Sequence, residues 1–322
     1  MNLSIHETGK KIEELVPSLT SDEIVLKESD LLSAMITFGS ISVTKKPCDI
    51  QFNPLKNQQA QIIQNSRKKL KLENTVIIHG TGNLQITGIA LTKDNRLIQC
   101  DKSSTGLIVL TENGQHIKNI TLSGNPWGIS VVPDTDEALI TVPLSIYVQI
   151  ISTVTYTPLR HVNAPCFYYY GITIVGNNVA LGGSNGKVYI INKKSVCLKE
   201  ISIGTGYVYS LCVKSAENLY CCAPNERKCL CIKLDGTIEF SYSSQELIGP
   251  IAAITDDQGN VYVIEYKSNN LHRFSAEGKF QEIMLTSTDG LKSPYSLAMN
   301  RNSSKMFIVN YSDKTLSIFS CH

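Results

Sequence analysis

The sequence has little charge and no long apolar run. Charged residues make up 18% of its 322 residues and the net charge is +2, so charge alone predicts no strong attraction to a polyanion. The apolar runs fall far short of the roughly 20 residues that a membrane span requires. The first residues, MNLSIHETGKKIEEL, are polar and amphipathic, and they predict no secretory signal. These absences predict a soluble, cytoplasmic protein without a membrane partner.

Motifs of common catalytic centres are also missing. There is no GxSxG nucleophile motif, and the six histidines are scattered without an acidic or nucleophilic partner. The glycines of GGSNGKV (182–188) are one residue too close for a phosphate-binding loop, and Val188 stands where that loop needs Ser or Thr. The sequence therefore predicts no catalytic residue and no cofactor in this chain. It leaves open whether the protein acts as part of an enzyme.

The ten cysteines do not have the spacing of a zinc site. No Cys/His series follows the CxxC or CxH patterns of RING and B-box ligands. The densest group, YCCAPNERKCLC, puts Cys221 and Cys222 side by side on one expected strand, where alternation sends their side chains to opposite faces. Without a secretion signal we expect reduced, largely buried thiols and no metal.

What the sequence does contain is a repeat of about 40 residues. The hairpin pattern of NLHRFSAEGKFQEIML (270–285) recurs in GLIVLTENGQHIKNITL (106–122) and KCLCIKLDGTIEFSY (228–242), with a glycine in each turn. A second strand-like unit precedes each hairpin and occurs in six copies. The first apolar residues of these copies, the anchors, are Ile89, Ile129, Ile172, Leu211, Ala252 and Leu297.

Four strands in each period of about 40 residues predict the blade of a β-propeller. We expect an all-β, six-bladed propeller over 71–322. The sixth copy ends after its third strand, TLSIFSC, and KLENTVIIHG (71–80) precedes the first copy. An open ring would leave two sheet edges unpaired, so this N-terminal strand should complete the last blade. The inner strands should be buried on both faces, and the pair in 270–285 should have one wet face.

Residues 1–70 do not share the repeat. Residues 5–16 place apolar side chains along one helical stripe, and Thr20 and Glu23 have capping-box spacing. A short helix is expected over 31–36, and residues 38–52 read as extended. Residues 1–70 should therefore be a helical and extended segment ending in a polar linker.

Three blades carry an acidic or amide residue directly after the second expected strand. They read QCDKSSTGLIVL with Asp101, VIEYKSNNLHRF with Glu265 and IVNYSDKTLSIF with Asn310. With the Glu-Gly and Asp-Gly turns, this pattern resembles the NHL repeat. The preceding SDEIVLKESDLLSAMITFGSISVTKKP resembles the stretch between coiled coil and propeller in invertebrate tripartite-motif (TRIM) proteins.

This resemblance implies recognition rather than catalysis. In TRIM–NHL proteins the propeller recruits protein or RNA targets, a RING domain serves ubiquitin ligation, and a coiled coil serves oligomerisation; RING, B-boxes and coiled coil are absent here. The expectation is a non-catalytic propeller that recruits a protein target of a ubiquitin ligase. The alternative is a single-stranded RNA-binding post-transcriptional repressor. A metal-dependent propeller hydrolase, with Asp101, Glu265 and Asn310 as oxygen ligands, is less favoured, because hydrogen bonding within turns accounts for such residues.

The candidate binding residues are mainly aromatic. Four aromatic residues each lie two positions before the anchor of their blade, at the start of the innermost strand: Trp127, Tyr170, Tyr209 and Tyr295. These starts should surround one mouth of the central channel, where rings stack on bases or grip a peptide. Packing against the neighbouring blade is the alternative. Arg160 and His161, expected in the loop before the third blade, and Lys292, before the sixth, would add positive charge there.

Overall fold

The computed structural model describes residues 23–25, 42–44, 69–80, 83–165 and 168–322. The chain divides into two compact units, 1–66 and 67–322. In the first unit, β1 (Glu23–Val25) pairs antiparallel with β2 (Ser42–Thr44), which lies in the stretch expected to be extended. The capping box expected between Thr20 and Glu23 is wrong, because Glu23 begins the strand β1. The other expectations for residues 1–68 lie outside the described residues.

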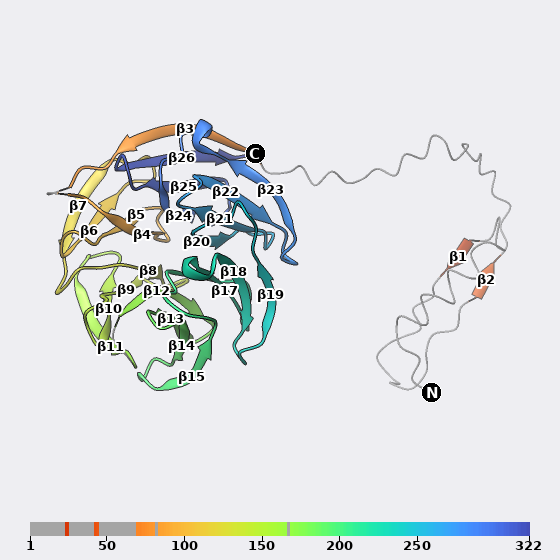
Figure 1. Ribbon diagram of the computed structural model, residues 1–322, viewed down its shortest axis with the longest axis horizontal. Helices are drawn as coiled ribbons and strands as arrows, with labels where there is room; N and C mark the ends of the chain where they lie inside the picture. The colour runs from red at the N-terminus through yellow and green to blue at the C-terminus, as the bar shows by residue number, and fades with distance from the viewer. Residues whose placement is uncertain (1–22, 26–41, 45–68, 81–82, 166–167) are drawn as a thin grey trace. The chain divides into compact units, whose positions relative to one another are not determined.

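The second unit is an all-β propeller of six four-stranded antiparallel blades, as predicted (Figure 1). Each blade begins with its innermost strand, and all six anchors lie in these strands. Their side chains are largely buried and line the central channel. The inner strands of blades 1 to 6 are β4 (Ile86–Leu91), β8 (Ile129–Val131), β12 (Tyr169–Val175), β16 (Ser210–Val213), β20 (Pro250–Thr255) and β24 (Pro294–Met299).

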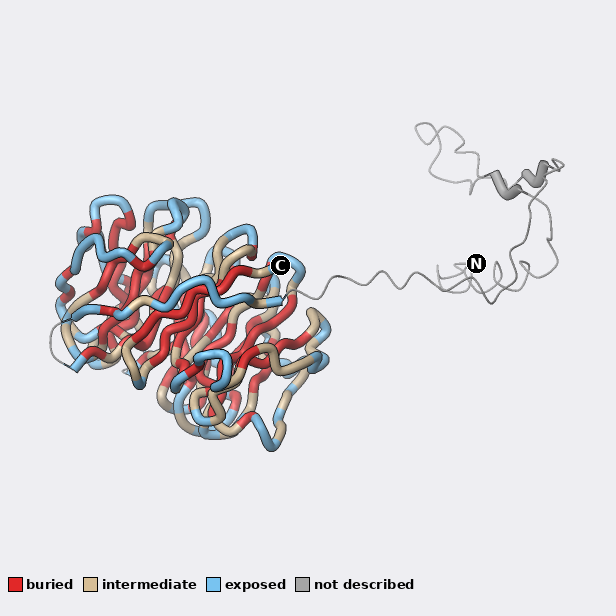
Figure 2. Tube along the Cα trace, turned by 90° about the horizontal axis from the view of Figure 1, so that it is seen from above, coloured by how far each residue is buried: buried red, intermediate tan, exposed pale blue. Residues whose placement is uncertain are grey.

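The second and third strands carry most of the core, because adjacent blades cover both of their faces (Figure 2). The second strands are β5 (Leu97–Asp101), β9 (Glu137–Thr141), β13 (Asn178–Gly183), β17 (Asn218–Ala223), β21 (Val261–Glu265) and β25 (Lys305–Asn310). The third strands are β6 (Gly106–Leu110), β10 (Tyr147–Ser152), β14 (Lys187–Ile191), β18 (Lys228–Lys233), β22 (Asn270–Phe274) and β26 (Thr315–Cys321).

The fourth strands form the rim and are mostly exposed. They are β7 (His116–Thr121), β11 (Pro158–Asn163), β15 (Cys197–Ser202), β19 (Ile238–Tyr242), β23 (Phe280–Leu285) and β3 (Leu70–Ile77). The wet face expected for the whole pair in 270–285 is found only on β23. β22 is buried, including His272 and Arg273, because the next blade covers the third strand. Short 3-10 turns follow β17 (η3, Pro224–Glu226) and β23 (η4, Ser287–Asp289).

Strand β3 completes blade 6, as the ring-closure argument predicts. It pairs antiparallel with β26, from Ile77 opposite Thr315 to Leu70 opposite Cys321. Val76 of β3 packs on the apolar core that blades 6 and 1 share. The ring therefore closes by joining two ends of the propeller within a single sheet. No helix among the described residues is long and apolar enough to span a membrane.

Candidate binding surface at one mouth of the central channel

The starts of the inner strands are tied together from blade to blade. The hydroxyl of Thr87 donates to the carbonyl of Trp127 (2.8 Å), and the hydroxyl of Thr141 donates to the carbonyl of Tyr170 (2.9 Å). A Cβ atom at Gly128 would lie only 2.4 Å from the Tyr170 oxygen. Only glycine permits so close an approach of two backbones. These contacts hold the backbone at Trp127 and Tyr170 against the neighbouring blade.

The four aromatic rings expected around the mouth meet one another. The ring of Trp127 lies 4.8 Å from that of Tyr170, 5.3 Å from that of Tyr209 and 6.2 Å from that of Tyr295, measured between centroids. Because these residues come from blades 2, 3, 4 and 6, the contacts run across the channel. The four rings, here called the aromatic cluster, cover the mouth rather than ring an open hole. Each ring is half-buried and keeps part of its surface in solvent.

Three further tyrosines extend the aromatic cluster. Tyr207 stacks on Tyr209 with 3° between the planes and centroids 5.3 Å apart. Tyr311 and Tyr266 lie 5.3 Å and 5.6 Å from Tyr295. Sequence reasoning missed these rings. A signal was present, since Tyr266 and Tyr311 directly follow Glu265 and Asn310, the residues that mark the end of the second strand.

Lys102 holds the same place in blade 1, directly after Asp101. Its ammonium nitrogen lies 4.8 Å from the centroid of the Trp127 ring and 6.0 Å from that of Tyr311, within the range of cation–π attraction. Burial lowers the pKa of this lysine from its usual value. The carbonyl of Lys102 also accepts a hydrogen bond from the side-chain amide of Asn125 (2.8 Å). Lys102 is therefore a cation held against the aromatic cluster.

An apolar groove runs outward from the aromatic cluster over blades 1 to 3. Its volume of about 790 Å³ is in the range of ligand-binding clefts. Leu144 is 77% exposed, Ile146 54% and Tyr168 47%, which is unusual for large apolar side chains grouped together. The groove is lined by Lys102, residues 123–127, residues 142–147, Tyr168 and Tyr170. Trp127 and Tyr170 belong to both features, so the cluster and the groove form one continuous surface.

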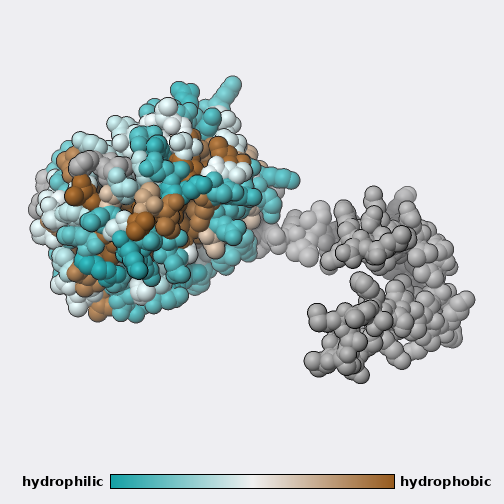
Figure 3. Space-filling view, turned by 90° about the horizontal axis from the view of Figure 1, so that it is seen from below, coloured by the Kyte–Doolittle hydropathy of each residue, from teal (hydrophilic) through white to brown (hydrophobic). Residues whose placement is uncertain are grey.

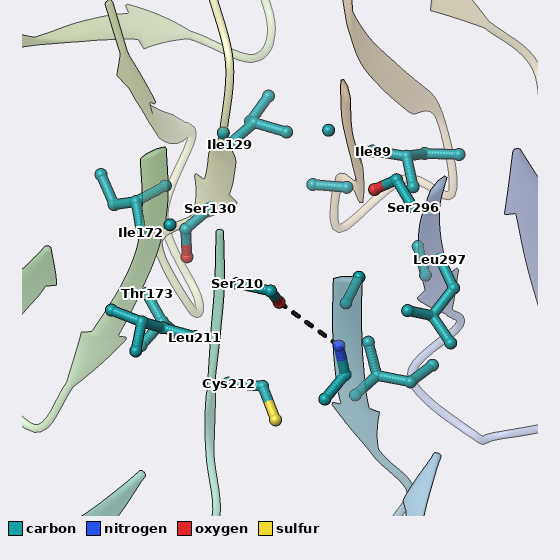
Figure 4. A pocket seen from close by; sticks show the side chains of 18 of the residues that line it. Ile89, Ile129, Ser130, Ile172, Thr173, Ser210, Leu211, Cys212, Ser296 and Leu297 are labelled. Carbon is teal, nitrogen blue, oxygen red and sulfur yellow. Dashed lines mark hydrogen bonds between the residues drawn. The ribbon is translucent and has the colours of Figure 1, made fainter. Parts of the chain in front are cut away.

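The channel beneath the aromatic cluster is smaller, about 290 Å³. Figure 4 shows the inner strands converging on it, with the hydroxyls of Ser130, Ser210 and Ser296 among aliphatic side chains. Ser210 accepts a hydrogen bond from the backbone N–H of Ala253 (3.3 Å). The lining contributed by the described residues contains no charged or imidazole side chain. This part of the chain offers no acid–base pair inside the channel.

The tyrosine hydroxyls of the aromatic cluster stay protonated. Burial, with smaller contributions from the neighbouring Tyr170 and Tyr207, raises the pKa of Tyr209 to about 12. Burial likewise raises the pKa values of Tyr295 and Tyr170. At physiological pH the cluster therefore presents neutral phenols, which can donate hydrogen bonds as well as pack against apolar groups.

The expected basic residues do not add free charge to this face. Arg160 and His161 lie in the outer strand β11, so their expected position in a loop is wrong. Arg160 makes a two-pronged ion pair with Glu137, at 2.5 and 2.8 Å, and His161 stacks on Tyr147 with centroids 4.0 Å apart. Lys292 does lie in the loop before blade 6, but its ammonium pairs with Asp313 (3.0 Å).

Asp101, Glu265 and Asn310 are the last residues of β5, β21 and β25 rather than the first residues of the following loops, and their side chains bind the backbone. Asp101 accepts from the N–H of Gln85 (3.0 Å), and Asn310 accepts from the N–H of Lys292 (3.0 Å). Glu265 accepts from the N–H of Gly249 in the same way. In each blade the bond ties the end of the second strand to the segment before the first. Among the described residues no group of three or more His, Cys, Asp or Glu is arranged to hold a metal ion.

The cysteines of blade 4 are buried thiols. Cys221 packs in a core shared with blade 3, whereas Cys222 and Cys229 pack in a core shared with blade 5. This confirms that the side chains of Cys221 and Cys222 face opposite ways. The four cysteines of this pair of strands, Cys221, Cys222, Cys229 and Cys231, form no disulfide within the described ranges, and burial raises the pKa of the Cys221 thiol well above its usual value. Such thiols are poor nucleophiles.

The described part of the rim exposes apolar side chains that are not grouped with charged or catalytic residues. Figure 3 looks at the propeller from below the view of Figure 1 and shows apolar patches broken up by hydrophilic side chains. Leu159 in β11 and Leu198 in β15 are about half exposed, at 49% and 51%. Scattered apolar residues of this kind are ordinary on protein surfaces.

Comparison with known proteins identifies the fold alone. No family model matches the chain, and no curated protein matches it in sequence. Among solved structures, a catalytically inactive virginiamycin B lyase from Staphylococcus aureus with quinupristin is similar, with a TM-score of 0.60, 12% identity, and coverage of 78% of this chain and 99% of that one. A streptogramin B lyase has a TM-score of 0.59 at 12% identity, over 77% of this chain and 98% of that one. These likenesses support the propeller fold and do not extend to an activity.

Proposed function

We propose that the propeller is a non-catalytic recognition module that binds an extended protein segment. The observation that carries this proposal is the continuity of the aromatic cluster with the apolar groove. Aromatic side chains dominate the binding energy of protein interfaces, and here they adjoin exposed Leu144 and Ile146. A segment lying in the groove would bury these side chains and end against Trp127.

Single-stranded RNA fits the same face less well. Stacked rings and Lys102 are features that a base-binding surface also uses. However, Lys102 is the one charged residue among the described residues that line the groove, and RNA binding depends on several cations along the phosphate backbone. Arg160 and Lys292 are engaged by carboxylates. The charge distribution therefore favours a protein segment.

The finer proposal is that the bound protein is delivered to a ubiquitin ligase in the cytoplasm. It rests on the resemblance of the blades to NHL repeats and on the buried thiols of blade 4, such as Cys221 and Cys222, which form no disulfide among the described residues and so suit a reducing compartment. Comparing the ubiquitination of proximity-labelled neighbours of the wild-type protein and of a groove variant tests it. Proteins that are no longer labelled by the groove variant and are also less ubiquitinated would support delivery. Proteins that are no longer labelled but keep the same ubiquitination would refute it.

The experiment for binding itself uses the full chain and a random dodecapeptide pool. Leu144→Ser/Ile146→Ser changes two exposed side chains, so the fold should be kept, and Leu198→Ser is a matched control on the rim. We expect peptides selected by the wild type to lose at least ~10-fold in affinity for the groove variant, because two buried aliphatic contacts disappear. The Leu198 control should bind as the wild type does.

A random single-stranded RNA pool at physiological salt gives the competing outcome. Salt-sensitive RNA binding that is lost in the groove variant, with no peptide selected, would overturn the proposal in favour of an RNA-binding repressor. Peptide binding that is equal in all three proteins would place the interface elsewhere.

A further inference from the structure

Lys102 is a cation held in a fixed place on the aromatic face. Its ammonium group lies over the ring of Trp127 and near that of Tyr311. The backbone around it is tied down as well, because its N–H donates to the carbonyl of Gln85 (3.0 Å) and its carbonyl accepts from Asn125 (2.8 Å). Attraction to two rings and a fixed backbone reduce the freedom that a surface lysine normally has.

No carboxylate of the described residues neutralises this cation. Of the basic residues that the sequence suggested for this face, Arg160 pairs with Glu137 and Lys292 with Asp313, whereas Lys102 forms no ion pair within the described residues. The nearest acid in sequence, Asp101, is already used, since its Oδ1 accepts from the backbone N–H groups of Gln85 and Ser103 and from the hydroxyl of Ser103. Lys102 also borders the groove, whose other described lining residues are uncharged.

We propose that Lys102 is the specificity residue of this surface, which selects a segment with a carboxylate beside a large apolar side chain. The carboxylate meets the Lys102 ammonium next to Trp127, and the apolar side chain lies on Leu144, Ile146 and Tyr168. This inference deepens the recognition function proposed above and rests on it. The carboxylate is either an Asp or Glu side chain or a free C-terminus, since both present the same group to the lysine.

Charge complementarity argues for this occupant. An ammonium beside rings and partly shielded from water attracts an anion more strongly than a fully exposed lysine does. A hydrogen bond to a charged group contributes about 1.5–3 kcal/mol, which corresponds to roughly 10- to 100-fold in affinity. A neutral apolar segment would leave the ammonium partly desolvated without a counter-ion, which disfavours it. The site therefore discriminates for carboxylates in addition to apolar groups.

The test uses two random dodecapeptide pools of equal composition, one with free C-termini and one amidated. Lys102→Met keeps the aliphatic stem over Trp127 and removes the charge, and Lys102→Glu reverses it. Lys118→Met is the matched control, because Lys118 also lies over a ring (5.4 Å from the Tyr156 centroid) but belongs to the rim strand β7. Thermal unfolding of each variant checks that it is folded.

We expect the wild type to enrich peptides that carry a carboxylate next to an apolar residue. Lys102→Met should weaken these peptides roughly 10- to 100-fold but leave their Asn or Gln analogues unchanged, and Lys118→Met should have no effect. Lys102→Glu should come to prefer Lys- or Arg-containing peptides. Enrichment only from the free-carboxyl pool identifies the C-terminus as the ligand group, and equal enrichment from both pools identifies a side chain.

Two failures are distinguishable. Peptides that depend on Leu144 and Ile146 but show no carboxylate preference, with Lys102→Met binding like the wild type, would overturn this inference and leave the recognition function standing. If neither pool yields a peptide sensitive to Leu144→Ser/Ile146→Ser, the recognition function fails and this inference fails with it.

Discussion

The indole of Trp127 stacks on the ring of Tyr209, with 5.3 Å between centroids and 20° between planes. Trp127 lies two residues before β8 of blade 2 and Tyr209 directly before β16 of blade 4, so the pair spans the channel past blade 3. Tyr170 of blade 3 meets both rings edge-on, at 83° and 87°. Three consecutive blades are therefore joined at the axis by side chains as well as by the backbone bonds between them.

This contact predicts energetic coupling between Trp127 and Tyr209. Trp127→Ala should lower the free energy of unfolding by about 2 kcal/mol, less than the ~3–5 kcal/mol of a fully buried ring. In a double-mutant cycle with Tyr209→Ala, urea unfolding should show a coupling energy of ~0.5–1.5 kcal/mol. A cycle between Trp127 and the rim residue Phe280 should be additive. Additivity in the Trp127–Tyr209 cycle would contradict a stacking contribution.

Ring closure predicts that the two ends of the N-terminal region differ in their effect on stability. Deleting 70–77 removes β3 and uncovers the side chains of β26 that pack with Val76, including Leu316 and Ile318. At about 1.5–3 kcal/mol for each aliphatic side chain uncovered, thermal unfolding should shift sharply downward. Deleting 1–60 should leave the melting temperature of the propeller unchanged. Equal shifts from the two deletions would refute closure by β3.

Two hairpin turns predict different costs for the same substitution. Gly236 and Gly278 both have positive φ angles, +98° and +81°, so alanine costs ~1–2 kcal/mol at either. At Gly278 an added Cβ atom would also lie 2.3 Å from the Phe240 ring, whereas at Gly236 the nearest atom is 3.9 Å away. Gly278→Ala should therefore be more destabilising than Gly236→Ala by ~1–3 kcal/mol. Chemical denaturation measures both, and Phe240→Ala should remove the excess; an excess that persists would rule out this clash.

Burial of His272 predicts loss of stability in mild acid. Burial lowers the pKa of this imidazole in the folded state, against smaller opposing effects of Glu265 and Glu246, and neither ring nitrogen has a hydrogen-bond partner among the described residues. Below the unfolded-state pKa of ~6.5 the unfolded chain binds a proton that the folded protein does not. The free energy of unfolding should therefore fall as the pH drops from about 6.5 toward the lower, folded-state pKa.

The variant His272→Phe removes the titrating group and keeps a ring in the same core. Its free energy of unfolding, measured in urea between pH 7 and pH 5, should decline less steeply than that of the wild type. Identical slopes would show that His272 does not contribute to the acid sensitivity.

Much of the fold was readable from the sequence because each blade repeats local rules. Turn glycines such as Gly114 and Gly278 adopt positive φ angles, and the apolar anchors mark the strands that line the channel. Ring closure followed from the cost of unpaired edges rather than from any motif. The burial of β22 did not follow from its pattern, because NLHRF alternates like a rim strand and only the neighbouring blade covers its polar side chains.

The binding surface was only partly readable. The register of the repeat identified Trp127, Tyr170, Tyr209 and Tyr295. It did not predict that their side chains would meet across the channel, because that contact depends on the width of the propeller channel and on the close backbone contact at Gly128. Lys102 went unnoticed because a single lysine in a polar loop has no pattern of its own. The positions of Arg160 and His161 were wrong because the length of the outer strand β11 is not marked by any turn residue.

The pairing that completes blade 6 has a consequence for how the chain could be rewired. Lys69 and His322 exchange two backbone hydrogen bonds, at 2.8 and 3.0 Å, so a tight turn of a few residues would join them as the two arms of a hairpin. The covalent break could then be moved between β3 and β4, where one blade ends and the next begins. In such a circular permutant each blade would be formed by one uninterrupted stretch of the chain. The same propeller could therefore be built with the chain entering the ring at a different blade boundary.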